Sequence, residues 1–112
     1  MIVELVSFRL KEDVDRGIFL RTSDAVGDLL QGCAGFHGRS VWEVPAENSW
    51  LDIVFWDNLE AGETASNYLR HHLTGVEFIN YLELMSVKIM YGDYRGSTAG
   101  ASLLPNDLQT EG

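Results

Sequence analysis

The side chains best suited to take part in a reaction are two adjacent histidines, His71 and His72, near the end of a predicted helix. A histidine gains and loses its proton near neutral pH, so either one suits a general acid or base, or a ligand contact. Metal-binding histidine pairs on a helix stand three or four residues apart, and adjacent residues face different directions. We therefore expect no metal site here. The structural alternative is that the C-terminal end of a helix favours cationic or polar side chains.

Two carboxylates interrupt strands that are otherwise apolar, Glu4 in the first predicted strand and Asp52 in the third. An ionised carboxylate in an apolar environment costs free energy unless it is paired. Glu4 either lies near the strand end and meets solvent, Lys88 or Arg39, or it faces a pocket. In the second case burial raises its pKa and suits it to act as a base. The same two alternatives hold for Asp52.

Aromatic residues form a third candidate group, made up of Trp42, Trp50, Trp56 and the helical Tyr68. They suit the walls of a pocket for a flat ligand, with Trp42, Trp56, Tyr68 and Asp52 as its contacts. The alternative is that the tryptophans pack in the core or in a subunit interface. The single cysteine, Cys33, has no base near it in sequence, so we expect an inert thiol.

The composition excludes several classes of function. The 112 residues carry a formal net charge of −9, with 8 Lys and Arg against 17 Asp and Glu. Nucleic-acid binding and attachment to an anionic membrane both need a basic surface, so neither is expected. No apolar run is long enough to span a membrane, and the first residues lack the features of a signal peptide. One cysteine permits no internal disulfide, and we expect a cytoplasmic protein.

The order of predicted elements indicates one α+β domain over residues 1–94, followed by a linker-like tail over 95–112. Strands are predicted at 2–10, 36–44, 50–56 and 82–91, with a turn at 45–49. A helix over 12–31, in one piece or two, precedes the second strand, and Gly32 is expected to end it. A second helix follows the Asp57–Asn58 cap, and a short third helix begins near Gly75. This order is the βαββαβ plan of a ferredoxin-like fold with a four-stranded antiparallel sheet.

The apolar content is high for a domain of this size. Hydrophobic residues make up 46% of the chain, and both faces of the first strand carry apolar side chains. Two helical segments cover one face of a four-stranded sheet, and the other face is left bare. We therefore expect part of the apolar surface to lie in a subunit interface or in a ligand pocket.

Several short segments resemble the dimeric α/β-barrel superfamily over residues 1–94. The matching segments are 5–11 (LVSFRLK), 35–38 (GFHG), 52–57 (DIVFWD), 68–72 (YLRHH), 76–78 (VEF) and the closing pair Asp93 and Tyr94. The two most similar branches are the stress-responsive α/β-barrel proteins and the antibiotic-biosynthesis-monooxygenase-like proteins. The resemblance implies a homodimer in which two sheets face each other as a barrel.

The resemblance also implies what the pocket holds. Cofactor-independent monooxygenases of this fold bind polycyclic aromatic compounds, and haem-degrading relatives use an Asn, a Trp and a His. The first strand here has no Asn, and Ser7 is its nearest polar residue, which disfavours haem degradation. The stress-responsive branch tends to carry a His early in this strand, where this chain has Glu4.

Two hypotheses of function follow. The first is a homodimeric enzyme without a bound cofactor or metal, similar to the monooxygenases, that acts on an apolar or aromatic compound. His71 or His72 would be the acid or base, Glu4 or Asp52 its partner, and the tryptophans the walls of the pocket. The second is a non-catalytic, stress-responsive dimer that uses the same cavity to bind a ligand, or serves a structural role.

Overall fold

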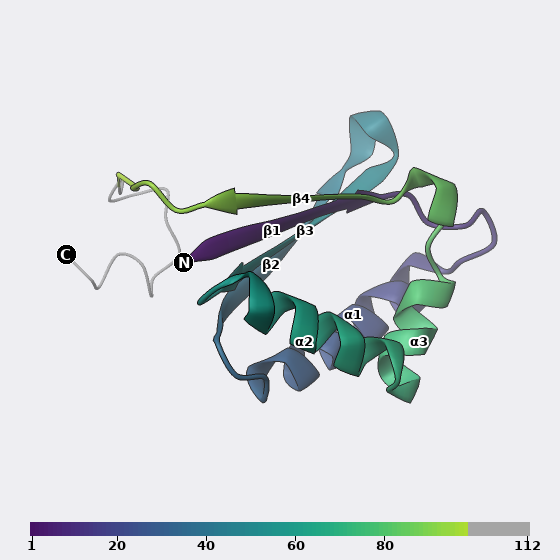
Figure 1. Ribbon diagram of the computed structural model, residues 1–112. Coiled ribbons are helices and arrows are strands. Elements are labelled where there is room, and N and C mark those ends of the chain that lie inside the picture. The colour runs from purple at the N-terminus through teal and green to yellow at the C-terminus, as the bar shows by residue number, and fades with distance from the viewer. Residues whose placement is uncertain (99–112) are drawn as a thin grey trace.

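The computed structural model describes residues 1–98 and shows a sheet with helices on one side (Figure 1). Its strands and helices, in chain order, are β1 (Ile2–Phe8), α1 (Arg16–Gln31), β2 (Phe36–Val44), β3 (Ser49–Trp56), α2 (Leu59–Arg70), α3 (Leu73–Asn80) and β4 (Lys88–Asp93). Short 3-10 turns precede β3 and β4, at η1 (Pro45–Glu47) and η2 (Leu84–Ser86). The α+β ferredoxin-like prediction is confirmed. Most of the predicted tail lies outside the described residues.

The sheet is antiparallel throughout, in the order β2-β3-β1-β4. Glu4 lies opposite Val54 of β3 and Tyr91 of β4, and the next inward position, Val6, lies opposite Asp52. Directly opposed residues share a face of the sheet. The register therefore puts the two carboxylates that interrupt the strands, Glu4 and Asp52, on one face as diagonal neighbours.

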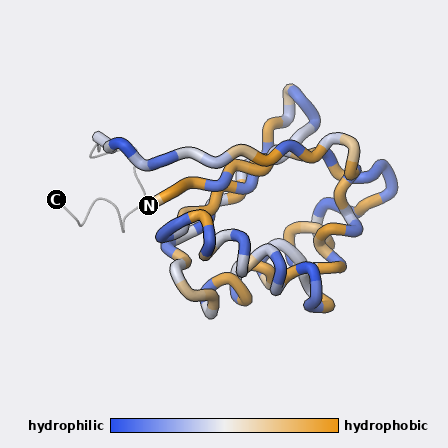
Figure 2. The backbone as a smooth tube through the Cα atoms, viewed as in Figure 1, coloured by the Kyte–Doolittle hydropathy of each residue, from blue (hydrophilic) through white to orange (hydrophobic). Residues whose placement is uncertain are grey.

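The helix-covered face carries the core. Alternate residues of β3 are buried, from Trp50 to Trp56, as expected for a strand with one packed face. The buried apolar residues form two clusters, Phe8, Phe19, Trp50 and Leu82 in one, and Val26, Leu30, Val54, Trp56 and Ala65 in the other. Hydrophilic residues gather instead in the loop after β1 and at the tip of the β2–β3 hairpin (Figure 2).

The first helix is shorter than predicted and continuous. It begins at Arg16 because Asp15 caps it, with Oδ1 accepting a hydrogen bond from the Ile18 amide at 2.9 Å. The interior Thr22 and Ser23, which allow a second cap in the sequence, are buried against the rest of the domain and do not divide the helix. It ends at Gly32, as predicted.

The end of the chain departs further from the predicted elements. The third helix begins at Leu73 because His72, not Thr74, is its N-cap. The last strand begins at Lys88, since Leu82 forms only an isolated bridge with Leu10 and a 3-10 turn intervenes. The second helix is capped by Asn58, whose Oδ1 accepts from the Ala61 amide at 2.9 Å.

Gly75 joins α2 to α3 at a contact that has no room for a side chain. A Cβ at this position would stand 2.0 Å from the carbonyl oxygen of Leu69. Only glycine therefore allows the first turn of α3 to approach the last turn of α2 this closely. Gly75 also lines the cavity described below, so this contact sets one of its walls.

In the described part of the chain, residues 1–98, no helix covers the second face of the sheet (Figure 1). The strand register puts eight apolar side chains on this face: Val3, Leu5, Trp42, Val44, Leu51, Ile53, Phe55 and Met90. Trp42 and Met90 are 57% and 62% exposed. Within residues 1–98, no helix is both long and apolar enough to cross a membrane.

Candidate functional site

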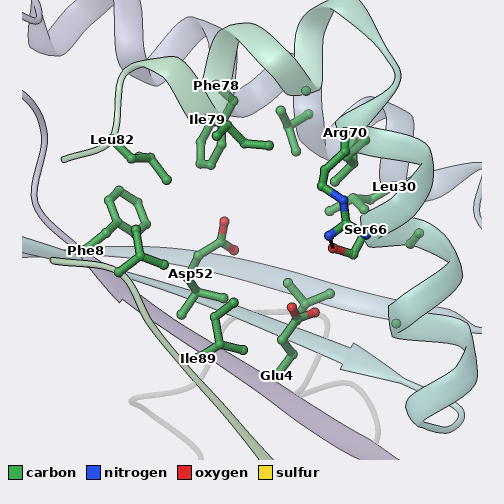
Figure 3. Close-up of a pocket in the computed structure, with 18 of the residues that line it drawn as sticks. Glu4, Phe8, Leu30, Asp52, Ser66, Arg70, Phe78, Ile79, Leu82 and Ile89 are labelled. Atoms are coloured by element: carbon green, nitrogen blue, oxygen red, sulfur yellow. Dashed lines mark hydrogen bonds between the residues drawn. The ribbon is translucent and has the colours of Figure 1, made fainter. Parts of the chain in front are cut away.

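A cavity of about 260 Å³ lies between the sheet and the helices (Figure 3). Its floor is formed by the helix-facing residues of the strands, which include Glu4, Val6, Phe8, Asp52, Val54, Trp56 and Ile89. Its roof comes from all three helices and includes Val26 and Leu30 of α1, Gly62, Ala65, Ser66, Leu69 and Arg70 of α2, and Gly75, Phe78 and Ile79 of α3. A largely apolar cavity with few convergent polar groups is the usual form of a small-molecule site.

Glu4 is the acidic group of the cavity that has no cationic partner within residues 1–98. Its Oε1 accepts a hydrogen bond from the indole Nε1 of Trp56 at 2.9 Å. Burial raises the pKa of the Glu4 carboxyl, the Trp56 hydrogen bond opposes that rise, and the negative charge of Asp52 adds to it. One carboxylate oxygen is thus held in place, and the carboxyl keeps its proton to a higher pH than an exposed glutamate does.

Asp52 lines the same cavity but is already paired. Its two carboxylate oxygens accept from Nε and Nη2 of Arg39 at 2.9 and 2.8 Å, and both side chains are about nine-tenths buried. The Arg39 guanidinium also donates to the carbonyl oxygen of Ser23 at 2.7 Å and to its hydroxyl at 3.1 Å. This network ties β2 and β3 to α1, so Asp52 and Glu4 differ in role although they share a face.

Arg70 is the cationic side chain of the cavity wall. It is the last residue of α2 and points toward the cavity, with Ser66 one turn before it (Figure 3). Arg70 is exposed at the edge of the cavity, and its Nη1 donates to the Ser66 hydroxyl on the same side of the helix at 3.1 Å. Among residues 1–98 it forms no ion pair.

Tyr91 stands beside Glu4 at the β4 edge, because the two are directly opposite across β1 and β4. Burial raises the pKa of the Tyr91 hydroxyl, the charges of Glu4 and Glu63 raise it further, and Arg70 opposes them. The hydroxyl is therefore a neutral phenol at pH 7. Tyr91 is 47% exposed and lies outside the cavity lining.

The structure places both candidate histidines outside the cavity lining. His71 is the C-cap of α2, is exposed, and its Nδ1 donates to the carbonyl oxygen of Asn67 at 2.8 Å. His72 is half-buried, and its Nδ1 accepts from the Thr74 amide at 3.2 Å as the N-cap of α3. Tyr68 lies beside His72, with ring centroids 5.6 Å apart, and is 45% exposed. These three residues belong to the joint between the two helices.

The three tryptophans are divided among different surroundings. Trp56 is buried, lines the cavity and supplies the hydrogen bond to Glu4. Trp50 packs in the core against Phe19, with ring centroids 4.9 Å apart. Trp42 lies on the uncovered face, where its Nε1 donates to the Ser40 hydroxyl at 2.9 Å. They do not form one aromatic wall.

Sequence reasoning thus brought Glu4, Asp52 and Trp56 together and missed Ser66 and Arg70. The available signal was their spacing of four along a predicted helix, which places two polar side chains on one face. Within residues 1–98, no three His, Cys, Asp or Glu side chains are grouped in a way that would hold a metal ion. The cavity therefore offers a ligand two polar groups without an ion-pair partner in residues 1–98, the Glu4 carboxyl and the Arg70 guanidinium.

The fold is similar to that of solved structures of the antibiotic-biosynthesis-monooxygenase type. SnoaB, a cofactor-independent oxygenase from Streptomyces nogalater, superposes with a TM-score of 0.69 at 12% identity, over 86% of this chain and 94% of that one. An antibiotic biosynthesis monooxygenase gives a TM-score of 0.66 at 8% identity, over 86% of this chain and 100% of its own. The predicted resemblance to this superfamily is confirmed for the fold.

A third similar structure is that of MhuD with two manganese protoporphyrin IX molecules bound per active site. It gives a TM-score of 0.61 at 13% identity, over 89% of this chain and 100% of that chain. No family model and no curated protein matches this chain in sequence. At these identities the likeness establishes the fold, and function must be argued from the residues of the cavity.

Proposed function

We propose that this protein binds an apolar or aromatic small molecule in the cavity between sheet and helices, and that Glu4 acts there as the catalytic base. The observation that carries the proposal is the Glu4 carboxyl, held by Trp56 in a largely apolar cavity and without a cationic partner among residues 1–98. Burial raises its pKa, which makes the carboxylate a stronger proton acceptor than an exposed glutamate. The monooxygenase-like architecture supports this choice of reaction class.

The proposed reaction needs only the substrate, molecular oxygen and this base. The Glu4 carboxylate removes a proton from an activated CH₂ group of the substrate, leaving a stabilised carbanion. The carbanion adds to O₂ and forms a peroxide anion, which takes the proton back from Glu4 as a hydroperoxide. The hydroperoxide then loses water and becomes a ketone. The balance is R₂CH₂ + O₂ → R₂C=O + H₂O, and Glu4 returns to its starting state.

The apolar cavity contributes to the rate in two ways. It replaces water around the reacting atoms, so the carboxylate is a stronger base than in solution. It also offers a flat ligand an aromatic wall at Phe8 and Phe78, whose rings pack edge to face against each other with centroids 6.1 Å apart. Asp52 raises the proton affinity of Glu4 but, being paired with Arg39, keeps a structural role.

The proposal includes assembly as a homodimer through the uncovered sheet face. Eight apolar side chains gather there, and no helix within residues 1–98 covers them. An interface of this kind would bury about 800 Å² per partner in a typical stable complex. A cytoplasmic location is the remaining part of the proposal, and it rests on the single cysteine.

The experiment compares wild type with Glu4→Gln on a simple anthrone such as dithranol. Ligand binding is measured by thermal shift, and oxygen consumption by an electrode, each corrected for the spontaneous reaction. We expect wild type to be stabilised by the anthrone and to accelerate its oxidation. Glu4→Gln should bind the anthrone but lose about a hundredfold or more of the rate, the usual contribution of a general base.

The matched control is Glu12→Gln, which makes the same chemical change at an exposed position in the loop after β1. It should keep both binding and rate. Binding without acceleration by wild type would favour the second hypothesis, a non-catalytic ligand-binding dimer. The absence of any stabilisation by the anthrone would contradict the proposed ligand class.

A further inference from the structure

We propose that the ligand of this cavity carries a carboxylate, and that Arg70, supported by Ser66, binds it. The proposal rests on the proposed function, since it names the chemical class of the molecule bound in the same cavity. It starts from a difference among the arginines. Within residues 1–98, Arg9, Arg16, Arg39 and Arg95 form ion pairs with carboxylates, whereas Arg21 and Arg70 form none. Of these two, only Arg70 lines the cavity.

The guanidinium of Arg70 is oriented before any ligand binds. Ser66 lies one helical turn earlier on α2, and its hydroxyl accepts from Nη1 at 3.1 Å. A guanidinium has five N–H donors, so this contact leaves a fork of donors free. Two parallel N–H groups match the two oxygens of a carboxylate, which makes this pairing stronger and more specific than a single hydrogen bond.

The position of Arg70 relative to the apolar lining defines the shape of the ligand. Arg70 and Ser66 lie on the α2 side of the cavity, and Phe8 and Leu82 lie on the opposite side (Figure 3). Phe78 of α3 lies near Phe8 in the apolar part. A molecule that fills the cavity therefore has an anionic group at one end and an apolar or aromatic body at the other.

The acidic groups of the cavity do not already satisfy Arg70. Asp52 is taken by Arg39, and the Glu4 carboxylate is held by Trp56. Neither lies within 4.0 Å of the Arg70 guanidinium. The remaining neighbour whose charge acts in this region is Glu63, which is exposed on the same helix. An incoming carboxylate would thus be the first anion to pair with Arg70 on the cavity side.

The test is a calorimetric titration at pH 7 with two probes of equal shape, 2-naphthoate and its neutral amide, 2-naphthamide. We expect wild type to bind the carboxylate at least about tenfold more tightly than the amide, as for a charge-assisted pair. Arg70→Gln should lose this preference and keep its affinity for the amide. Arg70→Lys, which keeps the charge but lacks the fork, should fall between the two.

The control is Arg21→Gln, which removes the same charge from an exposed position outside the cavity lining. It should retain the preference for the carboxylate. Equal affinity of wild type for both probes, or an undiminished preference in Arg70→Gln, would overturn the carboxylate assignment and leave the proposed cavity function standing. If neither probe binds wild type, the proposed function itself fails, and this inference with it.

Discussion

The indole Nε1 of Trp56 donates to Glu4 Oε1 at 2.9 Å, from the neighbouring strand and toward the same cavity. The contact satisfies the only polar atom of a side chain that is 1% exposed. It also fixes one oxygen of the Glu4 carboxyl and leaves the other free to face a ligand. A buried tryptophan thus orients the group to which we assign the chemistry.

This relationship predicts a pH dependence of stability. Burial raises the pKa of Glu4 in the folded state, so the folded protein binds a proton at Glu4 more tightly than the unfolded chain. The stability due to Glu4 is therefore fully present below the unfolded pKa, and it is lost as the pH rises through the folded pKa. Glu4→Gln should remove this loss and become more stable relative to wild type as the pH rises above the ordinary pKa of a glutamate.

The measurement is the free energy of unfolding in urea for both proteins at several pH values. Gln keeps an oxygen that can accept from Trp56, so the variant changes the charge more than the contact. For Glu12→Gln, in an exposed loop, the free energy of unfolding should change with pH in the same way as for wild type. Parallel curves for Glu4→Gln and wild type would show that the pKa of Glu4 is not raised by folding.

A second prediction concerns the pair of Arg39 and Asp52 beneath the cavity. Asp52→Asn leaves the guanidinium buried with its charge uncompensated, which typically costs about 3–5 kcal/mol of unfolding free energy. Denaturant titration measures this cost. The double variant R39M/D52L removes both charges together and should be closer to wild type in stability than Asp52→Asn.

The reference for this prediction is Glu43→Gln in the surface pair with Arg16, where both side chains are largely exposed. Its effect should be far smaller, because solvent screens such pairs. A loss in Asp52→Asn no larger than that in Glu43→Gln would mean that Arg39 finds water or another partner. In that case the Arg39 network would not organise the floor of the cavity.

The first three strands could be predicted well from the sequence, because their apolar alternation and the turns between them are local signals, whereas the strand predicted at 82–91 begins only at Lys88. The predicted strand 36–44 agrees with β2 at both ends. Helix ends were less predictable, since several residues compete to cap each helix. Asp15 and His72 cap α1 and α3, and no simple pattern distinguishes His72 from the neighbouring Thr74.

The candidate site was predictable only where a residue is unusual in the sequence itself. Glu4 could be found because a carboxylate among apolar residues is anomalous in any register. Arg70 could not, since the cavity-facing side of α2 depends on how that helix packs. Ala61 and Ala65 turn toward the core cluster that includes Leu30 of α1. This rotation turns Arg70 toward the cavity and leaves the exposed Tyr68 outside its lining.

A third prediction tests the joint between α2 and α3. Gly75→Ala introduces a Cβ that would stand 2.0 Å from the Leu69 carbonyl oxygen, so the two helices must separate. We expect a loss of about 2 kcal/mol or more in unfolding free energy, together with weaker ligand binding. Gly38→Ala is the control, since a Cβ there meets nothing within 4 Å. Equal stability of the two variants would mean that the helix joint adapts easily.

The last prediction concerns the uncovered face of the sheet. Ile53 lies at the middle of this face on β3, between Leu5 of β1 and Ser40 of β2. If two copies meet there, Ile53→Lys buries a charge in the interface and should give a monomer by light scattering at micromolar concentration. The control, Leu73→Lys, puts the same charge on α3, where Leu73 is 87% exposed, and it should remain a dimer. A wild-type mass equal to that of one chain would contradict the dimer. It would mean that the apolar face stays exposed to water in a stable monomer.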